Sequence, residues 1–228
     1  MLSQRPLTVA VPKGRLLPRI ATLLSQVGID ASSVDEASRR LTFDLPSQNL
    51  RFILAKPSDV PILVEYGAAD VGIAGRDVLL EADMEVCELL DLGIGRCRMV
   101  VASPVGRGIT RIDQLSFTSR VATKYPHITV EFFRQHGIQA EVIKMNGNIE
   151  VAPMVGLADV IVDITETGTT LRENGLVEIG KLFDITSRLI ANRVSYKLEY
   201  SRIRTMADDL ADVIKRRACD TARSDALT

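Results

Sequence analysis

The stretch Val160–Leu176, VIVDITETGTTLRENGL, decides the fold class. It begins with a short apolar run that ends on Asp163, passes through a loop containing Gly168, and enters a helical segment at Leu171–Asn174. A strand, a glycine turn and a helix start direct free backbone N–H groups toward an anion. Because no lysine follows the glycine, the pattern differs from the nucleotide-binding P-loop.

Two interpretations of this stretch stay open on the residues alone. A threonine-capped helix after a strand is common in α/β proteins and needs no ligand. Gly168, however, lets a phosphate approach the backbone, and the neighbouring threonines add hydroxyl donors. Asp163 stands at the strand end, where open α/β sheets bind ligands. A carboxylate beside a phosphate loop suits a sugar diol or a metal, so the stretch predicts a phosphorylated sugar.

Length, net charge and cysteine content indicate a globular protein without features of nucleic-acid binding or a zinc site. The 228 residues allow one large domain or two small lobes. The net charge of −1 gives no basic excess for nucleic acid. The three cysteines form no C-x-x-C pair, which fits a reducing compartment and gives no zinc site. Neither a signal peptide nor a membrane-spanning run is present in the sequence, so we expect a cytoplasmic protein.

Short β-like runs alternate with amphipathic stretches, which predicts an α/β protein with a largely parallel sheet. The expected strands are Leu7–Val11, Phe52–Ala55, Val71–Ala74, Val86–Leu92, Met99–Ala102, Arg120–Ala122, Ala140–Ile143, Val160–Asp163 and Val177–Phe183. The expected helices are Leu16–Val27, Ser58–Tyr66, a short one ending at Glu81, Ile128–His136, Ile149–Leu157 and Lys197–Ala218.

Two segments are expected to connect two lobes. The glycine- and proline-containing run Ser103–Gly108 is the first, and Ser187–Asn192 is the second. The first lobe would then comprise residues 1–102 and 184–228, and the second lobe residues 103–183. A cleft between two such lobes is a common site for small ligands.

Cationic side chains near strand ends are candidates for binding phosphates. Lys13 and Arg15 follow the first expected strand, although a solvated surface turn is an equally good interpretation. Arg39 and Arg40 form a basic pair that is more often surface than site.

Acidic residues have competing interpretations too. Glu150 either favours a helix dipole in a first turn or faces Asp163 as a second carboxylate. Asp70 and Asp77 either line the cleft or cap helices. The two histidines, His127 and His136, lie on one expected helix and are interpreted as structural, so nothing indicates covalent catalysis.

Taken together, several segments resemble the ATP phosphoribosyltransferase family, which catalyses the first step of histidine biosynthesis. The segments that carry the resemblance are VPKGR at 11–15, EASRR at 36–40, SDVPILVEYGAADVGIAGRDVL at 58–79, ELLDLGIGRCRMVVA at 88–102, VATKYPHITVEFF at 121–133, EVAPMVGLADVIVDITETGTTL at 150–171 and SRLIANRVSYK at 187–197. Lys56 stands where the family usually has arginine, and Asn148 where serine is common.

The resemblance implies the two-lobed α/β architecture of type II periplasmic binding proteins, with the active site in the inter-lobe cleft. It implies a reaction that joins N1 of the adenine of ATP to C1 of phosphoribosyl pyrophosphate and releases pyrophosphate, with Mg²⁺ present. The chain is similar to the short form of the family, without a C-terminal histidine-binding domain. That form implies a homodimer of catalytic subunits and a hetero-oligomer with a regulatory subunit similar to histidyl-tRNA synthetase.

The resemblance also implies which residues form the site. Positioning and charge, rather than a nucleophile, would drive the reaction. The expected catalytic residues are Arg15, Arg39, Glu150 and Asp163. Those expected to bind phosphoribosyl pyrophosphate are Asp163, Thr167, Gly168, Thr169, Thr170 and Leu171. Those expected to bind ATP are Lys13, Gly14, Arg15, Gly75 and Asp91. Mg²⁺ is assigned to the substrate phosphates and to no residue.

Two other functions are compatible with the fold class. A non-catalytic two-lobed solute binder would have the same architecture, but such proteins are usually exported, and this chain keeps a complete phosphate loop. A catalytically silent paralogue would be expected to lose charged site residues. The presence of Arg15, Arg39, Glu150 and Asp163 together favours the enzyme.

Overall fold

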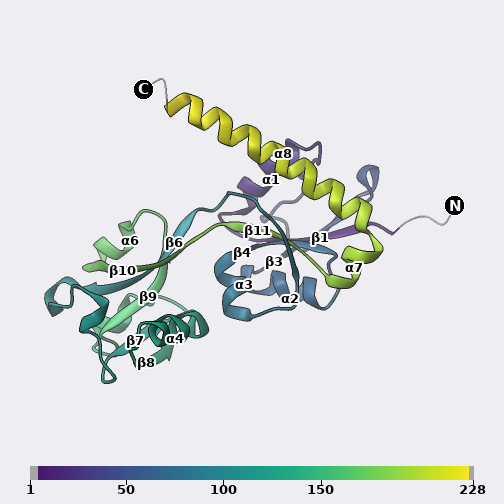
Figure 1. Ribbon diagram of the computed structural model, residues 1–228. Coiled ribbons are helices and arrows are strands. Elements are labelled where there is room, and N and C mark those ends of the chain that lie inside the picture. Colours follow the sequence, from purple (N-terminus) through teal and green to yellow (C-terminus); the bar gives the residue numbers. More distant parts are fainter. Residues whose placement is uncertain (1–4, 226–228) are drawn as a thin grey trace. The chain divides into compact units, whose positions relative to one another are not determined.

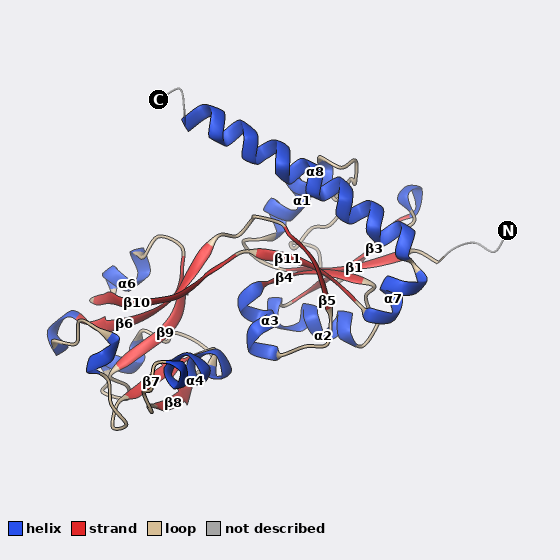
Figure 2. Ribbon diagram, viewed as in Figure 1, coloured by secondary structure: helices blue, strands red, loops and turns tan. Residues whose placement is uncertain are grey.

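The computed structural model describes residues 5–225, which divide into two compact units (Figures 1 and 2). Among these residues, unit 1 comprises 5–79, 83–95 and 186–225, and unit 2 comprises 80–82 and 96–185. The chain leaves unit 1 after Gly95 rather than after Ala102, because Cys97–Pro104 is one strand bonded along its length to unit 2. It returns at Thr186, two residues after the expected boundary at 184.

Unit 1 contains a six-stranded sheet in the order β2-β3-β1-β4-β11-β5. Its strands are β1 Leu7–Pro12, β2 Thr42–Leu45, β3 Leu50–Ala55, β4 Val71–Gly75, β5 Cys87–Asp91 and β11 Ser187–Ala191. β1 is buried over its whole length and pairs in parallel with β3 and β4, as expected for an apolar central strand. The other pairs are antiparallel, so the expectation of a largely parallel sheet is wrong here. β11 was expected to be a connecting segment, and β2 was not predicted.

Helices cover both faces of this sheet (Figure 2). They are α1 Leu17–Ser25, α2 Val60–Glu65, α3 Arg76–Ala82, α7 Arg193–Leu198 and α8 Tyr200–Asp225. Val9 of β1 lies in one hydrophobic cluster with residues of α1 and α8, whereas its neighbour Ala10 lies in another with residues of α2. Gly72 allows α2 to pack closely on β4, because a Cβ there would lie 2.7 Å from Val64 Cγ2.

Unit 2 contains a five-stranded sheet in the order β10-β6-β9-β7-β8. Its strands are β6 Cys97–Pro104, β7 Arg120–Thr123, β8 Glu141–Lys144, β9 Val160–Thr165 and β10 Leu176–Ile185. β7 pairs in parallel with β8 and β9, whereas β6 is antiparallel to both of its neighbours. This sheet is therefore mixed as well.

The two faces of the second sheet carry separate hydrophobic clusters. Val160 and Val162 pack with residues of α4 Pro126–Gln135, while Ile161 packs on the other face with residues of α5 Val151–Met154 and α6 Thr169–Glu173. α5 is much shorter than the helix expected at Ile149–Leu157, because Gly156 takes a left-handed φ of 72° and the turn ends there. Short 3₁₀ turns span Pro46–Gln48, Pro57–Asp59, Val105–Arg107 and Ile112–Gln114.

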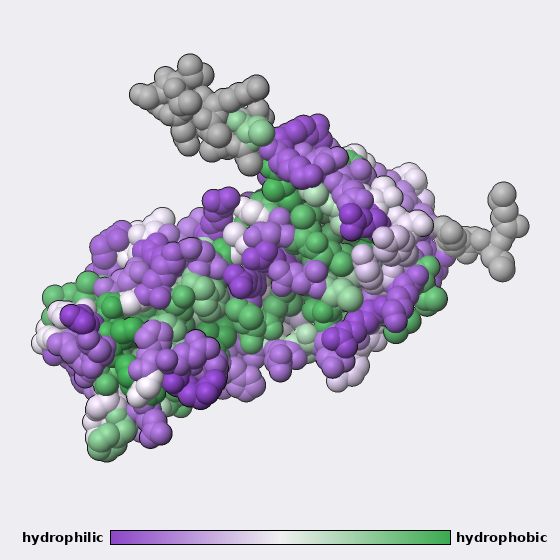
Figure 3. Space-filling view, viewed as in Figure 1, coloured by the Kyte–Doolittle hydropathy of each residue, from purple (hydrophilic) through white to green (hydrophobic). Residues whose placement is uncertain are grey.

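The helix expected from Lys197 forms as two helices, α7 and α8, joined at Glu199. Asn192 caps α7: its Oδ1 accepts hydrogen bonds from the N–H groups of Val194 and Ser195. Its Nδ2 donates to the carbonyl oxygens of Val64 and Glu65 at the end of α2. In Figure 3, hydrophilic residues cover much of the visible surface. No helix within residues 5–225 is long and apolar enough to cross a membrane.

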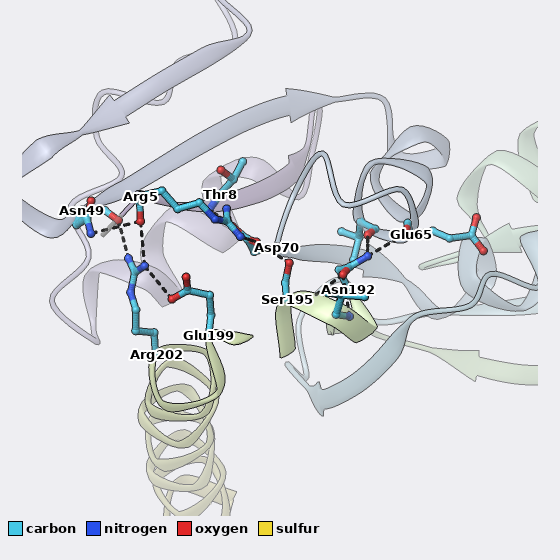
Figure 4. A network of polar contacts seen from close by, with 11 residues as sticks. Arg5, Thr8, Asn49, Glu65, Asp70, Asn192, Ser195, Glu199 and Arg202 are labelled. Atoms are coloured by element: carbon cyan, nitrogen blue, oxygen red, sulfur yellow. Dashed lines mark hydrogen bonds and ion pairs between the residues drawn. The ribbon is translucent and has the colours of Figure 1, made fainter. Parts of the chain in front are cut away.

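A buried carboxylate fixes the amino-terminal edge of the first sheet (Figure 4). Asp70 is 1% exposed and precedes β4. It accepts hydrogen bonds from the Arg5 guanidinium at 2.6 and 2.9 Å, from the Thr8 N–H at 2.8 Å and from Ser195 Oγ at 2.6 Å. Arg202 of α8 donates one hydrogen bond to the Arg5 carbonyl oxygen and another to that of Asn49. Asp70 therefore has a structural role, and of its two open interpretations the one that places it at a ligand site does not hold.

Burial alone would raise the pKa of Asp70, because desolvation disfavours the charged form. The hydrogen bonds from Arg5, Ser195 and Thr8, together with the Arg5 charge, outweigh this effect and lower the pKa of Asp70 below its ordinary value. A lowered folded-state pKa contributes stability above the unfolded-state pKa of about 3.9, and this contribution is lost as the pH falls through the folded-state value.

Replacing Asp70 by asparagine should lower the free energy of unfolding at pH 7 by about 2–3 kcal/mol, because an amide Nδ2 would face the donors that now bind a carboxylate. The difference from the wild type should be constant between pH 7 and pH 5 and should shrink below about pH 4. Urea unfolding at each pH measures it. Asp44→Asn, in an exposed pair with Arg51, is the control and should cost less than about 1 kcal/mol. An Asp70→Asn difference that does not change with pH would contradict this account.

Candidate functional site

The loop between β9 and α6, in which the sequence predicts an anion site, turns at Gly168. Gly168 takes φ 76°, in the left-handed region that favours glycine, and immediately precedes α6. Its N–H donates to Thr165 Oγ1 at 2.9 Å, which closes the turn. The hydroxyl oxygens of Thr167 and Thr169 lie 2.9 Å apart, and both residues are exposed. The loop is thus an ordered turn with accessible hydroxyl groups.

The first turn of α6 adds backbone donors next to this loop. The first N–H groups of a helix have no carbonyl partner within the helix, so those of Thr170 and Leu171 are suited to an anion. The Leu171 side chain is buried in the cluster that also contains Ile161 and Leu176. Leu171 can therefore contribute only its backbone, while its side chain anchors the helix.

Two guanidinium groups that sequence reasoning missed hold this loop. Arg172 of α6 donates from Nη1 to the Thr167 carbonyl oxygen at 3.1 Å and from Nη2 to Thr169 Oγ1 at 3.2 Å. Arg98 of β6 donates from Nη1 to the Glu166 carbonyl oxygen at 3.3 Å. The helical spacing of Arg172 from Gly168 could have indicated its role. Arg98 could not be found in the same way, because only the pairing of β6 with β9 brings it to Thr165.

The two predicted carboxylates lie on elements that pack together. Ile161, Asp163 and Thr165 alternate along β9 and so face the same side of the sheet. Asp163 is buried, and its Oδ1 accepts the Ile164 N–H at 2.8 Å. Glu150 immediately precedes α5, which packs against β9 and β6. The structure thus brings the elements carrying Asp163 and Glu150 to one face of the second sheet.

The predicted ATP residues meet at one edge of the first sheet. β1, β3 and β4 run in parallel, so Pro12, Ala55 and Gly75 end at the same edge. β5 also ends there, because β11 pairs antiparallel with both β4 and β5. The expected residues at this edge are Lys13, Gly14, Arg15, Gly75 and Asp91.

A hydrogen bond links the Arg39 loop to the same edge. The Gly14 N–H donates to Glu36 Oε2 at 2.8 Å, and Gly14 has a left-handed φ of 90°. Arg39 follows Glu36 by three residues and is exposed, as is Arg15 beside Gly14. The structure therefore brings the turn of Arg15 and the loop of Arg39 together, through an acid that sequence reasoning missed.

Asp91 has structural partners that the sequence did not predict. Its carboxylate pairs with Arg188 Nη1 at 2.7 Å and accepts the Gly93 N–H at 2.9 Å. The loop that follows packs on the start of α1, since a Cβ at Gly95 would lie 2.5 Å from Leu16 Cδ2. Gly75 is constrained as well, because a Cβ there would overlap the Asp77 carboxylate.

Neither histidine takes part in these arrangements. His136 is held by its own helix: its Nδ1 lies 2.8 Å from the Phe132 carbonyl oxygen, and its ring lies against the Phe132 ring. His127 is exposed near the start of α4. Among the described residues, no group of three or more His, Cys, Asp or Glu side chains could hold a metal ion. The arrangement is one of backbone donors, cations and carboxylates.

Known proteins resemble this chain over most of its length. The family model described as "HisG: ATP phosphoribosyltransferase" matches residues 56–212. The ATP phosphoribosyltransferase of Halalkalibacterium halodurans is 50% identical over 210 residues, which cover 92% of this chain and 97% of the relative. That of Bacillus subtilis is 51% identical over 209 residues, which cover 92% of this chain and 96% of the relative.

Solved structures agree with the sequence comparisons. A chain of the "ATP phosphoribosyl transferase (HisG:HisZ) complex from Thermotoga maritima" is 33% identical with a TM-score of 0.76, over 92% of this chain and 99% of that one. The periplasmic aliphatic sulphonate binding protein SsuA of Escherichia coli shares the fold at 13% identity, with a TM-score of 0.58 over 99% of this chain and 78% of that one. The expected architecture, that of type II periplasmic binding proteins, is confirmed. The chain belongs to the ATP phosphoribosyltransferase family.

Proposed function

We propose that this chain transfers the phosphoribosyl group of phosphoribosyl pyrophosphate to N1 of the adenine of ATP, releasing pyrophosphate, in the first step of histidine biosynthesis. One observation carries the proposal: a member of this family has an ordered loop around Gly168, with backbone and hydroxyl donors, following the strand that holds the buried Asp163. A phosphate loop beside a carboxylate suits a phosphorylated sugar, because the phosphate and the sugar hydroxyls need opposite kinds of partner.

Unit 2 would bind phosphoribosyl pyrophosphate. Backbone N–H groups and hydroxyls of Thr167, Thr169, Thr170 and Leu171 would hold the 5-phosphate, and Gly168, whose N–H closes the turn, would let the phosphate approach the backbone. Asp163 and Glu150 would accept hydrogen bonds from the ribose hydroxyls. As pyrophosphate leaves, positive charge builds on the ribose ring, and these carboxylates would stabilise it. Adenine N1 attacks with its own lone pair, so no strong general base is needed.

Unit 1 would bind ATP. Lys13, Arg15 and Arg39 would neutralise polyphosphate oxygens at the edge where the strands end, with arginine offering two parallel donors. Gly14 and Gly75 would let the nucleotide approach the backbone, and the loop after Asp91 would contribute beside them. That the active site lies between two lobes stays a prediction.

Mg²⁺ fits this site as a cation bound by substrate rather than by a protein cage. The described residues offer no group of three or more metal-binding side chains, and Mg²⁺ commonly uses one or two carboxylates plus substrate phosphates. We propose that it accompanies the polyphosphates, with Asp163 and Glu150 as the nearest carboxylates of unit 2. When bound, it would neutralise charge on the leaving pyrophosphate.

We also propose that the chain forms a homodimer and assembles with a regulatory subunit similar to histidyl-tRNA synthetase. The support for the assembly with a second subunit is the Thermotoga maritima structure, which is described as a HisG:HisZ complex and whose similar chain is covered over 99% of its length. The homodimer is proposed from the family resemblance alone. Light scattering of the chain alone and mixed with such a subunit would measure both assemblies.

The reaction itself is tested by following the adenine ultraviolet absorbance of purified protein with ATP, phosphoribosyl pyrophosphate and Mg²⁺. Turnover should require both substrates, and added histidine should inhibit only when the partner subunit is present. Folded protein that binds phosphoribosyl pyrophosphate yet shows no turnover, with or without the partner, would identify a silent paralogue instead.

Replacing Asp163 by asparagine should lower kcat/KM for phosphoribosyl pyrophosphate by about 10- to 100-fold, because the variant loses the charge that binds the diol and stabilises the ring. The KM for ATP should stay within about twofold of the wild type. Thermal unfolding of the variant measures separately whether the folded protein is retained. Unaltered kinetics for the sugar substrate would remove Asp163 from this role.

Replacing Arg39 by alanine should lower kcat/KM by about 100-fold, because the guanidinium would no longer stabilise phosphate charge in the transition state. The side chain is exposed, so the free energy of unfolding should change by less than about 0.5 kcal/mol. Arg40→Ala, at the neighbouring exposed arginine, is the matched control. Equal losses in both variants would indicate a diffuse charge effect, and an unchanged rate in Arg39→Ala would exclude Arg39 from the mechanism.

A further inference from the structure

An ion pair between Arg98 and Glu178 lies beside the loop around Gly168, and the proposed reaction assigns no role to it. Arg98 of β6 donates from Nε and Nη2 to Glu178 Oε2 of β10, at 3.0 and 2.9 Å. The third nitrogen of the same guanidinium, Nη1, donates to the Glu166 carbonyl oxygen at 3.3 Å. Both side chains are about one-third exposed, at 32% each. Arg98 thus joins β10 to the first residue of the loop.

The geometry of the peptide bond gives this contact a consequence for the loop. The Glu166 carbonyl and the Thr167 N–H belong to one planar trans peptide and point in opposite directions. A guanidinium that holds the carbonyl therefore directs the Thr167 N–H away from Arg98. Arg172 holds the next carbonyl, that of Thr167, in the same way, and the Gly168 N–H of that peptide donates to Thr165 Oγ1.

The negative charge of Glu178 distinguishes a positioning role from a direct electrostatic one. A carboxylate near an anion site repels the phosphate, so by charge alone it weakens binding. Its contact with Nε and Nη2 of Arg98 fixes the plane of the guanidinium, in which Nη1 reaches the loop. Lysine carries the same charge but has a single ammonium without this fork, so it could not hold both partners in one plane.

We propose that Arg98 is a positioning residue for the phosphate loop, that Glu178 orients Arg98, and that the pair sets the affinity for phosphoribosyl pyrophosphate without touching the reacting atoms. This inference rests on the proposed function, because it takes the 5-phosphate of that substrate as the ligand of the loop. By orienting Arg98, Glu178 would raise the affinity for phosphoribosyl pyrophosphate, whereas its negative charge alone would lower that affinity.

The test is Glu178→Gln, assayed with the partner subunit present. The KM for phosphoribosyl pyrophosphate should rise about tenfold, since a charge-assisted hydrogen bond that orients Arg98 is weakened. The KM for ATP and kcat should stay within about twofold, because neither ATP binding nor the reacting atoms are touched. A merely structural role would instead lower kcat through loss of folded protein, which thermal unfolding measures independently.

Glu173→Gln is the matched control, since Glu173 is an exposed acid at the end of α6, near the same loop. Its neutralisation should leave the KM for phosphoribosyl pyrophosphate unchanged or lower it slightly. Arg98→Lys should raise that KM although it keeps the charge, because it loses the fork, and Arg98→Met should raise it at least as much, because it loses both. Should Glu178→Gln fail to fold, this pair of variants tests the proposal by itself.

Failure of the positioning role and failure of the proposed function give different outcomes. A lower or unchanged KM in folded Glu178→Gln, or a wild-type KM in Arg98→Lys, would overturn the positioning role. In the second case Arg98 would act through its charge, as a direct ligand of the phosphate. Wild-type protein that neither turns over nor binds phosphoribosyl pyrophosphate in calorimetry would overturn the proposed function instead.

Discussion

The buried carboxylate of Asp70 is the interaction on which the arrangement of unit 1 depends. It collects hydrogen bonds from Arg5 and Thr8 near the start of the chain and from Ser195 of α7, all of them 62 or more residues away from Asp70 in sequence. A buried charge without such partners would cost several kcal/mol, so these elements are held together once Asp70 is buried. Asn192 adds a second link in unit 1, because its side chain joins the start of α7 to the end of α2.

This anchoring takes place at the amino-terminal edge of the parallel strands and leaves the opposite edge to loops. Lys13, Gly75 and Asp91 all lie at that opposite edge, where strands end and chain directions change. Unit 2 follows the same rule, because the loop around Gly168, where we propose that phosphate binds, begins where β9 ends. In both sheets the buried strands place the candidate site residues at their ends, which suits the proposed reaction, in which placement and charge provide the catalysis.

Local patterns predicted most strands and the strand, glycine turn and helix around Gly168, because apolar runs, glycine and helix-start residues act over a few positions. They failed where a segment's partner lies far away in the chain. β11 was expected to be a connecting segment, because its apolar residues do not reveal that it inserts between β4 and β5. Asp70 could equally have lined a site, and only its contacts with Arg5 and Ser195 show that it is structural.

The sequence by itself determined the family and the α/β class and predicted the candidate site residues, since these depend on residue types at fixed local spacing. Only the tertiary structure decided which strands are antiparallel, where the chain passes from one unit to the other, and which groups hold the site loops. Arg98 reaches the phosphate loop through the pairing of β6 with β9, and Glu36 reaches Gly14 across a turn. The physical reason is that long-range hydrogen bonds and charge pairs form between residues whose separation in sequence carries no signal of their proximity.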